Sequence, residues 1–334
     1  MPLTVAQGQR RAFNGSSSPG PLWRCYRTFT AFMLVSVVLL LWWLRGNTNY
    51  SCTNCHVKVN TFSVNSSMIN SCPEMPPYLV GTMDVVQNPP SLEQQEKSFP
   101  DVFVGGRYAP HECVSRHQVA LIIPYRDREA HLRAFIYHMH HMLRRQQLQY
   151  QIFVVEQAGK DLFNRGKLFN VGYLVASGLH GFECFIFHDV DMIPVNDHNL
   201  YTCSDHPRHL TVSVDAFHNR LPYQDFFGGA CAMTKDHVKM VNGFSNKYWG
   251  WGGEDDDMFY RVNDHGLKVR RYSPDVAKYI MLPHKRAERS PSRSKLLSEA
   301  TGRYDTDGLN NITYKKLTII PQRLFTWILA DLQE

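Results

Sequence analysis

The chain has 334 residues, of which 43% are hydrophobic and 20% are charged. This is an ordinary globular composition, with room for one large domain or two small ones. The net charge of +6 is modest, and no long run of lysine and arginine with interleaved aromatic residues occurs. Composition and charge therefore argue against a nucleic-acid-binding protein.

A membrane anchor is predicted near the N-terminus. Residues 28–44 form an uncharged apolar run of 17 residues that ends with Trp42, Trp43 and Leu44. This length is at the lower limit for crossing a bilayer, and tryptophan is typical of the membrane interface. Four arginines precede the run and one follows it, which predicts a cytoplasmic N-terminus. The expected organisation is a tail over 1–27, a signal-anchor over 28–44, a stem over 45–100 and a folded lumenal domain over 101–334.

Cysteines and glycosylation sequences fit a lumenal domain. Disulfides can form in that compartment. The candidates on that side are Cys72, Cys113, Cys184 and Cys203. Potential N-glycosylation sites begin at Asn49, Asn65 and Asn311. Cys52 and Cys55 have the spacing of a zinc or redox pair. Because the segment is polar and no second pair occurs, we interpret them as a local or intersubunit disulfide.

Strands and helices alternate from residue 118 onward. Short apolar runs typical of buried strands lie at 118–124, 151–156 and 183–188, and helical patterns extend to about 147 and over 168–179. This alternation predicts an α/β domain with a mainly parallel sheet. Ligands of such sheets bind beyond the carboxyl ends of the strands. The polar residues at those ends are Arg126, Arg128, Asp189 and Asp191.

Two of these pairs suggest ligands. Asp189 and Asp191 are two positions apart, so extended geometry points both carboxylates to one side. Such oxygen ligands suit Mn²⁺ or Mg²⁺, above all when a diphosphate supplies further oxygens. Arg126 and Arg128 could bind a phosphate or lie in a solvated loop. Taken alone, Met281 and His284 are interpreted as a core methionine and an incidental histidine.

The segment 249–257 carries the strongest chemical signal. Two tryptophans alternate with glycines, and the four acids Glu254, Asp255, Asp256 and Asp257 follow. Adjacent carboxylates repel one another, so such a run needs a physical reason. The combination suits a site that stacks on a polyhydroxylated ligand and removes a hydroxyl proton. The alternative is an acidic helix N-terminus.

Several segments together resemble the β-1,4-galactosyltransferase family, including its related invertebrate β-1,4-N-acetylgalactosaminyltransferases. They are residues 163–172, 188–194, 227–229, 242–244 and 249–257, and the likeness covers about 113–320 in the family's order. The resemblance implies a Rossmann-like GT-A domain that binds a nucleotide sugar. It also implies a manganese-dependent Golgi type II membrane protein with a lumenal catalytic domain.

The resemblance assigns roles residue by residue. The donor would be bound by Pro124, Tyr125, Arg126, Arg128, Phe163, Arg165, Asp189, Val190, Gly229 and Trp251. Manganese would be held by Asp191, Met281 and His284, which replaces the first interpretation of Met281 and His284. The acceptor would be bound by Gly253, Glu254, Asp255, Asp256 and Arg293, with Asp255 as the catalytic base. The implied disulfides are Cys72–Cys113 and Cys184–Cys203.

The implied activity is inverting transfer of galactose or N-acetylgalactosamine from the UDP-sugar to terminal N-acetylglucosamine of glycoproteins or glycolipids, in β1,4 linkage. Residues 282–302 would form a lid over the donor. Phe226 stands where galactose-transferring members carry tyrosine, which tilts our expectation slightly toward N-acetylgalactosamine. Ser294 stands where an aromatic residue would help to hold the acceptor.

Three alternatives are kept beside this expectation. One is a strictly galactose-transferring enzyme, and another is an inactive member that binds carbohydrate or forms complexes. A lumenal metal-dependent hydrolase is the third. The sequence leaves open whether the chain forms a homodimer or needs an accessory protein.

Overall fold

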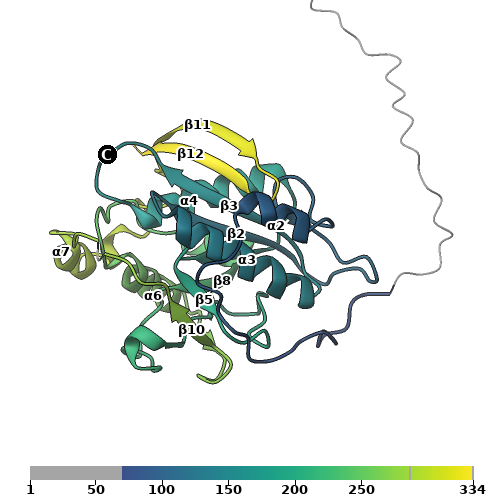
Figure 1. Cartoon of the computed structure of the whole chain (residues 1–334). Coiled ribbons are helices and arrows are strands. Elements are labelled where there is room, and N and C mark those ends of the chain that lie inside the picture. Colours follow the sequence, from purple (N-terminus) through teal and green to yellow (C-terminus); the bar gives the residue numbers. More distant parts are fainter. Residues whose placement is uncertain (1–69, 286, 333–334) are drawn as a thin grey trace, which may run out of the picture. The chain divides into compact units, whose positions relative to one another are not determined.

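A computed structural model describes residues 70–285 and 287–332 (Figure 1). The predicted tail, anchor and first part of the stem, with Asn49, Asn65, Cys52 and Cys55, lie outside these residues. In the part that is described, no helix combines the length and the apolar character needed to cross a bilayer.

The centre of the domain is a sheet that is buried on both faces. Its first three long strands are β2 (Gln118–Tyr125), β3 (Gln149–Gln157) and β4 (Cys184–His188), and β2 pairs in parallel with the other two. The side chains of β2 alternate between two hydrophobic cores, as strand geometry requires. Val119 and Leu121 pack with α3 (Glu129–Arg145), whereas Ala120 and Ile122 pack with α4 (Arg165–Leu179). Burial on both faces explains the continuous apolar runs in the sequence.

The remaining elements are short or lie at the edges. The strands are β1 (Arg107–Tyr108), β5 (Met192–Pro194), β6 (Arg208–His209), β7 (Ser213–Val214), β8 (Ala230–Thr234), β9 (Arg270–Arg271), β10 (Lys278–Met281), β11 (Tyr314–Pro321) and β12 (Thr326–Leu332). The helices are α2 (Leu92–Ser98), α5 (Lys235–Met240), α6 (Glu254–Asp264) and α7 (Arg293–Ser298), with the 3₁₀ turns η1 (Asp215–Phe217) and η2 (Thr301–Arg303).

The sheet is mixed, which corrects the expectation of a mainly parallel sheet. The strand order is β11-β12-β3-β2-β4-β8-β6-β9, with β1 paired to β3. Of its eight pairings, four are parallel (β12–β3, β3–β2, β2–β4, β6–β9) and four are antiparallel. Three of the parallel pairings join β12, β3, β2 and β4 at the centre, and the fourth, β6–β9, lies at one edge beyond the antiparallel β8. The sequence patterns had identified only the long central strands.

A small second sheet brings together distant parts of the chain. In it β10 pairs antiparallel with β5 and parallel with β7. Because β5 follows β4 directly, this sheet places the end of β10 beside the carboxyl end of β4, with Met281 opposite Met192.

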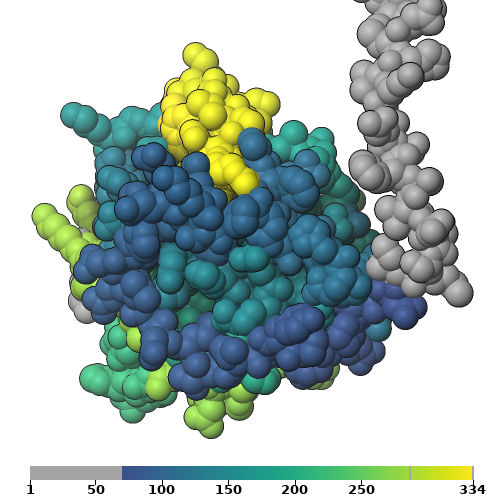
Figure 2. Space-filling view, turned by 45° about the vertical axis from the view of Figure 1, so that its right-hand side comes forward, coloured from purple at the N-terminus to yellow at the C-terminus, as the bar shows by residue number. Residues whose placement is uncertain are grey.

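The packed part of the chain begins before the predicted boundary at residue 101. The helix α2 lies within the interval assigned to the stem, and Gln95 and Phe99 are fully buried. Ser91 and Gln94 form a capping box at its start, a signal that the sequence carried. In Figure 2 the first described residues, in purple and dark blue, run as a band across one face of the domain.

Both expected disulfides are confirmed. Cys72 is bonded to Cys113, and Cys184 is bonded to Cys203. The third glycosylation candidate, Asn311, is exposed, and its glycosylation stays a prediction.

Gly172 tests how closely α4 must approach the sheet. A methyl group at this position would overlap the side chain of Ile122 and lie 2.9 Å from Cγ2 of Val155. We expect Gly172→Ala to lower the free energy of unfolding by about 1–3 kcal/mol, because the packed core cannot absorb the extra volume. Urea unfolding would measure the change.

The matched control is Gly178, on the same helix. An added methyl there would meet nothing within 4 Å. Gly178→Ala should therefore stabilise the protein by roughly 0.4–1 kcal/mol. Equal effects of the two substitutions would contradict this account of helix–sheet packing.

Candidate active site

The acidic segment begins α6, and it also faces the candidate site. Gly253 is the residue before the helix, with a positive φ of 102°. A side chain there would clash with the ring of Tyr248, so this turn requires glycine. The four acids occupy the first turn of α6, where backbone N–H groups favour negative charge. The helix-start and ligand-site interpretations of this segment are therefore compatible.

The four carboxylates have different surroundings. Glu254 forms an ion pair with Arg165 at 3.1 Å, and Asp256 accepts a 2.7 Å hydrogen bond from the hydroxyl of Tyr223. Asp257 is fully buried and pairs with Arg261 at 2.6 Å. Asp255 accepts a hydrogen bond from its own backbone N–H, and no other side chain of residues 70–285 and 287–332 bonds its carboxylate. Among the described residues, Asp255 is thus the acid of this segment whose carboxylate has no side-chain hydrogen bond or ion pair, so it is free to bind a ligand.

The electrostatics of Asp255 suit a base. Desolvation, with the neighbouring charges of Glu254 and Asp256, raises the pKa of this carboxyl to about 7, and Arg165 only partly opposes the change. A carboxylate with a pKa near the working pH is basic enough to accept a proton and still ionised in a useful fraction of molecules.

A buried network fixes the turn that carries these acids. Besides Arg261, the carboxylate of Asp257 accepts hydrogen bonds from Tyr248 at 2.9 Å and from Arg303 at 3.1 Å. Arg261 and Arg303 also approach Asp307, at 3.6 and 3.4 Å. Asp257, Arg261 and Asp307 are all but inaccessible to solvent. The first turn of α6 is therefore tied to the segment that follows the predicted lid.

Arg165 connects the acids of α6 to the carboxylates after β4. Its Nε lies 2.5 Å from Oδ1 of Asp189, and its Nη1 lies 3.1 Å from Oε1 of Glu254. The guanidinium also packs over the ring of Phe169, at 4.6 Å from the ring centre. Burial and the charge of Asp191 raise the pKa of Asp189 to about 6, against the opposing effect of Arg165.

The three predicted metal ligands lie together. Nε2 of His284 is 2.6 Å from Oδ2 of Asp191, and the backbone N–H of Leu282 donates to the carbonyl of Asp191 at 2.8 Å. The β5–β10 pairing brings Met281 to the same place. Burial acts to raise the pKa of Asp191, but the hydrogen bond and charge of His284 outweigh it and lower that pKa.

The predicted donor set combines hard and softer donors. The carboxylate of Asp191 suits manganese, and diphosphate oxygens could fill further positions, whereas the imidazole and the thioether are softer donors. In the described part of the chain, no cluster of three or more His, Cys, Asp and Glu side chains could hold a metal. The third donor of this set is the thioether of Met281.

Several of the predicted donor-binding residues lie at or near the carboxyl end of β2. Arg126 donates to the carbonyl of Asp161 at 2.7 Å and lies over the ring of Phe163. Arg128 precedes α3 and contacts Nδ1 of His131 at 3.4 Å. Pro124 and Tyr125 end β2, and Val190, between the two aspartates in sequence, is buried in the core.

The backbone after residue 225 joins the donor and acceptor sides. The N–H of Asp189 donates to the carbonyl of Gly229 at 2.9 Å. A methyl group on Gly228 would lie 2.5 Å from Oδ2 of Asp255 and 2.9 Å from Cζ of Phe226. The ring of Phe226 and the carboxylate of Asp255 therefore flank the same short stretch of backbone.

The predicted lid packs against Trp251. The backbone N–H of Trp251 donates to the carbonyl of Glu288 at 2.7 Å, and the carbonyl of Trp251 accepts from the N–H of Ser290 at 3.0 Å. The guanidinium groups of Arg289 and Arg293 lie 5.8 and 5.5 Å from the centre of the indole. Trp251 remains 55% exposed, so more than half of its surface stays open to solvent. Ser294 follows Arg293 in α7.

Sequence reasoning missed His131. The centre of its ring lies 6.1 Å from that of His284. Burial lowers the pKa of His131, and the charge of Asp191 partly opposes this change. The signal was present, because residues 128 and 131 are three apart at the start of a helix and so share a face. His131 thus belongs to the side of the site that faces the metal ligands. The structure brings the predicted site residues together, while the individual roles assigned to them stay predictions.

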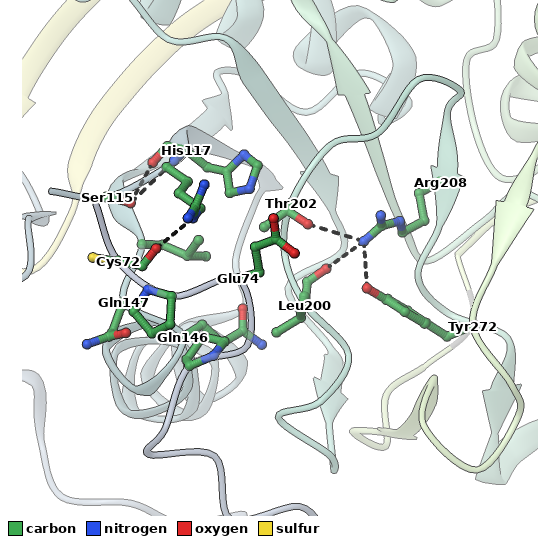
Figure 3. Close-up of a pocket in the computed structure, with 14 residues that line it drawn as sticks. Cys72, Glu74, Ser115, His117, Gln146, Gln147, Leu200, Thr202, Arg208 and Tyr272 are labelled. Atoms are coloured by element: carbon green, nitrogen blue, oxygen red, sulfur yellow. Dashed lines mark hydrogen bonds between the residues drawn. The ribbon is translucent and has the colours of Figure 1, made fainter. Parts of the chain in front are cut away.

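A separate cavity of about 480 Å³ lies at the opposite end of β2 (Figure 3). It is lined by His117, which precedes β2, and by Arg116 and Arg208. β2 has eight residues, so its two ends are roughly 25 Å apart. None of the predicted catalytic or metal-binding residues lines this cavity.

The fold is similar to solved glycosyltransferase structures. The catalytic domain of Drosophila β1,4-galactosyltransferase 7 in complex with xylobiose is 34% identical, with a TM-score of 0.56, covering 65% of this chain and 95% of that chain. A mutant of that enzyme in complex with manganese, UDP-Gal and xylobiose has 32% identity and a TM-score of 0.55, over the same shares. The fold and the clustered site define a glycosyltransferase with a GT-A-like domain.

Sequence comparison gives the family. Residues 72–204 match the N-terminal region of glycosyl transferase group 7, and residues 208–285 match the N-terminal domain of galactosyltransferase. Human β-1,4-galactosyltransferase 1 is 45% identical over 266 residues, covering 78% of this chain and 67% of the relative. Rat β-1,4-galactosyltransferase 4 is 46% identical over 265 residues, covering 78% and 77%. The chain belongs to the β-1,4-galactosyltransferase family.

The metal-ligand assignment can be tested without measuring catalysis. We expect His284→Ala to weaken Mn²⁺ binding by at least about tenfold, because the substitution removes a nitrogen donor. The decrease of the free Mn²⁺ EPR signal on titration with protein and UDP would measure it. His198→Ala is the control, since Nδ1 of His198 also approaches an aspartate, Asp197, at 3.6 Å. Equal affinities of the two variants would remove His284 from the ligand set.

Proposed function

We propose that this protein transfers a hexose from UDP-N-acetylgalactosamine or UDP-galactose to terminal N-acetylglucosamine in β1,4 linkage, with inversion and with manganese as cofactor. The observation that carries the proposal is the unshared carboxylate of Asp255. It lies beside Phe226 and Gly228. Its neighbour Glu254 is paired with Arg165, which is also paired with Asp189. The family membership supports the reaction type.

In the proposed mechanism the chain supplies position and proton transfer. Asp255 accepts the proton of the acceptor hydroxyl as the oxygen attacks the anomeric carbon from the face opposite the nucleotide. Arg165 holds Asp189 and Glu254 in fixed positions, so that donor and acceptor meet in one orientation. The exposed face of Trp251 gives the sugars an apolar surface on which to stack.

The leaving nucleotide requires positive charge. Arg126 and Arg128, at the carboxyl end of β2, are placed to bind its phosphates. Manganese, held by Asp191, Met281 and His284, would stabilise the negative charge that develops on the departing diphosphate. The lid over residues 282–302, packed on Trp251, excludes water that would otherwise compete with the acceptor.

The side chain at position 226 bears on the donor sugar. Phe226 is 9% exposed and is enclosed by the rings of Phe217, Tyr223 and His209. A tyrosine would add a hydroxyl beside Asp255 and reduce the space for an N-acetyl group. The phenylalanine therefore favours N-acetylgalactosamine slightly in our proposal.

We also propose that the domain works in the Golgi lumen behind the predicted anchor over residues 28–44. The two disulfides, which require an oxidising compartment, support this placement. Digestion of the domain by protease added outside sealed Golgi vesicles would contradict it.

Asp255→Asn tests the reaction and the base together. We expect residues 46–334 with Mn²⁺ and a β-N-acetylglucosaminide to give product from at least one of the two donors. Asp255→Asn should lower kcat by about 10²–10⁴-fold with UDP binding retained, because an amide cannot take the proton. Asp264→Asn, at the other end of α6, should keep the parent rate.

The pH profile follows from the pKa of Asp255, about 7. The base is active when ionised, so kcat/KM should fall by about tenfold per pH unit below that value. No product from either donor would contradict the proposed function. A full rate in Asp255→Asn would contradict only the assignment of the base.

Phe226→Tyr tests the donor preference. We expect the ratio of kcat/KM for UDP-galactose to that for UDP-N-acetylgalactosamine to rise on the order of tenfold, because the hydroxyl occupies space that the N-acetyl group needs. Initial rates with both donors would measure the ratio. The control is Phe217→Tyr, since the ring of Phe217 packs edge-on against the ring of Phe226. An unchanged ratio in Phe226→Tyr would show that position 226 does not select the donor.

A further inference from the structure

The segment that carries Phe226 is held by a charged group from another strand. Arg271, in β9, uses Nη2 to donate to two backbone carbonyls, those of Gln224 and Phe226, both at 2.9 Å. Its Nε donates to Nδ1 of His209 at 3.1 Å. One guanidinium therefore fixes two carbonyls and orients a histidine ring, with three of its five N–H groups.

His209 extends this connection to Gly228. The register of the sheet places His209 of β6 directly opposite Arg271 of β9. Because Nε of Arg271 is a donor, Nδ1 of His209 must accept, which leaves the proton on Nε2. That nitrogen lies 2.9 Å from the carbonyl oxygen of Gly228 and donates to it. The contacts are thus consistent with a single tautomer of the ring.

The histidine stays neutral over the working pH range. Its side chain has no solvent exposure, and burial lowers the pKa of His209 to about 3, with a further contribution from the charge of Arg271. The hydrogen bond to Gly228 acts in the opposite direction and is outweighed. The hydrogen bonds that link Arg271 through His209 to Gly228 therefore do not change over the physiological pH range.

The three fixed carbonyls lie around the donor-selecting ring. Those of Gln224 and Phe226 are held by Arg271, and that of Gly228 is held by His209. The His209 ring also packs edge-on against Phe226, with centroids 5.5 Å apart. Since Gly228 separates the Phe226 ring from Asp255, a shift of this segment would change the distance between the donor sugar and the base.

We propose that Arg271 and His209 are positioning residues that set donor-sugar selectivity by fixing the backbone of residues 224–228. The proposal rests on the proposed hexosyl transfer and deepens it. Neither residue lies among those assigned to donor, acceptor or metal. Their effect on the reaction is exerted through Phe226 and Gly228.

The test compares Arg271→Lys with a matched control. Lysine keeps the charge but cannot reproduce the planar fork that reaches two carbonyls and the histidine. The control is Arg323→Lys, because Nη2 of Arg323 also lies near two backbone carbonyls, those of Phe99 and Pro100, at 3.4 and 3.2 Å. Both variants are made in the full-length protein, alone and combined with Phe226→Tyr.

Two readouts distinguish positioning from a general loss of structure. Hydrogen exchange of the ligand-free protein should become faster in residues 222–229 for Arg271→Lys and stay unchanged there for Arg323→Lys. The ratio of kcat/KM for UDP-galactose to that for UDP-N-acetylgalactosamine should be at least about fivefold lower in the double variant Phe226→Tyr/Arg271→Lys than in Phe226→Tyr. A fivefold change corresponds to about 1 kcal/mol. UDP affinity should be unchanged in each variant. His209→Ala should reproduce both effects.

The outcomes separate the two proposals. If the parent protein transfers neither sugar, the proposed function fails, while hydrogen exchange still tests whether Arg271 holds the segment. Unchanged exchange in residues 222–229, or equal donor ratios in Phe226→Tyr and the double variant, would overturn the positioning role. An equal fall in both donor rates with an unchanged ratio would leave Arg271 a purely structural residue and would also overturn it.

Discussion

The site depends on the ion pairs of Arg165. This guanidinium stands between Asp189, at the end of a central strand, and Glu254, at the start of α6. Without it, the carboxylates of Asp189, Asp191 and the first turn of α6 would repel one another across a poorly hydrated site. One positive charge thus allows the carboxylates after β4 and those at the start of α6 to lie close together. Arg165 itself is held because it begins α4, which packs on the central strands.

A second constraint comes from the way the sheets are connected. The predicted metal ligands follow the end of β4 and the end of β10, which are almost a hundred residues apart in sequence. They meet because β10 adds to β5 in the small sheet. The position of Met281 and His284 therefore depends on backbone pairing at Met192, and the lid begins at the same place. The predicted metal site and the predicted lid therefore depend on the same backbone pairing.

The sequence predicted the centre of the fold well, because buried parallel strands have continuous apolar runs that end in polar residues. The strand over 118–124 and the carboxylates at 189 and 191 followed from that pattern. The two-residue strands β6 and β9 have no periodicity to detect, so the mixed character of the sheet was not foreseen. For the same reason, the pairing of His209 with Arg271 could not be predicted. The family resemblance supplied the candidate residues of the site, but their contacts with one another and with Tyr223 and His131 depend on the three-dimensional arrangement.

The buried network under α6 limits how this region can vary among related proteins. Asp257, Arg261 and Asp307 are buried and Arg303 is partly buried, and together they balance two negative and two positive charges. Replacing a single member would leave a charge buried without its partner, which is more costly than the pair itself is stabilising. Two acids and two arginines, separated by up to fifty positions along the chain, are therefore expected to be inherited as a unit, or exchanged together for apolar residues of similar volume. Substitutions at these positions should be correlated among homologues even though none of the four residues is assigned to bind substrate.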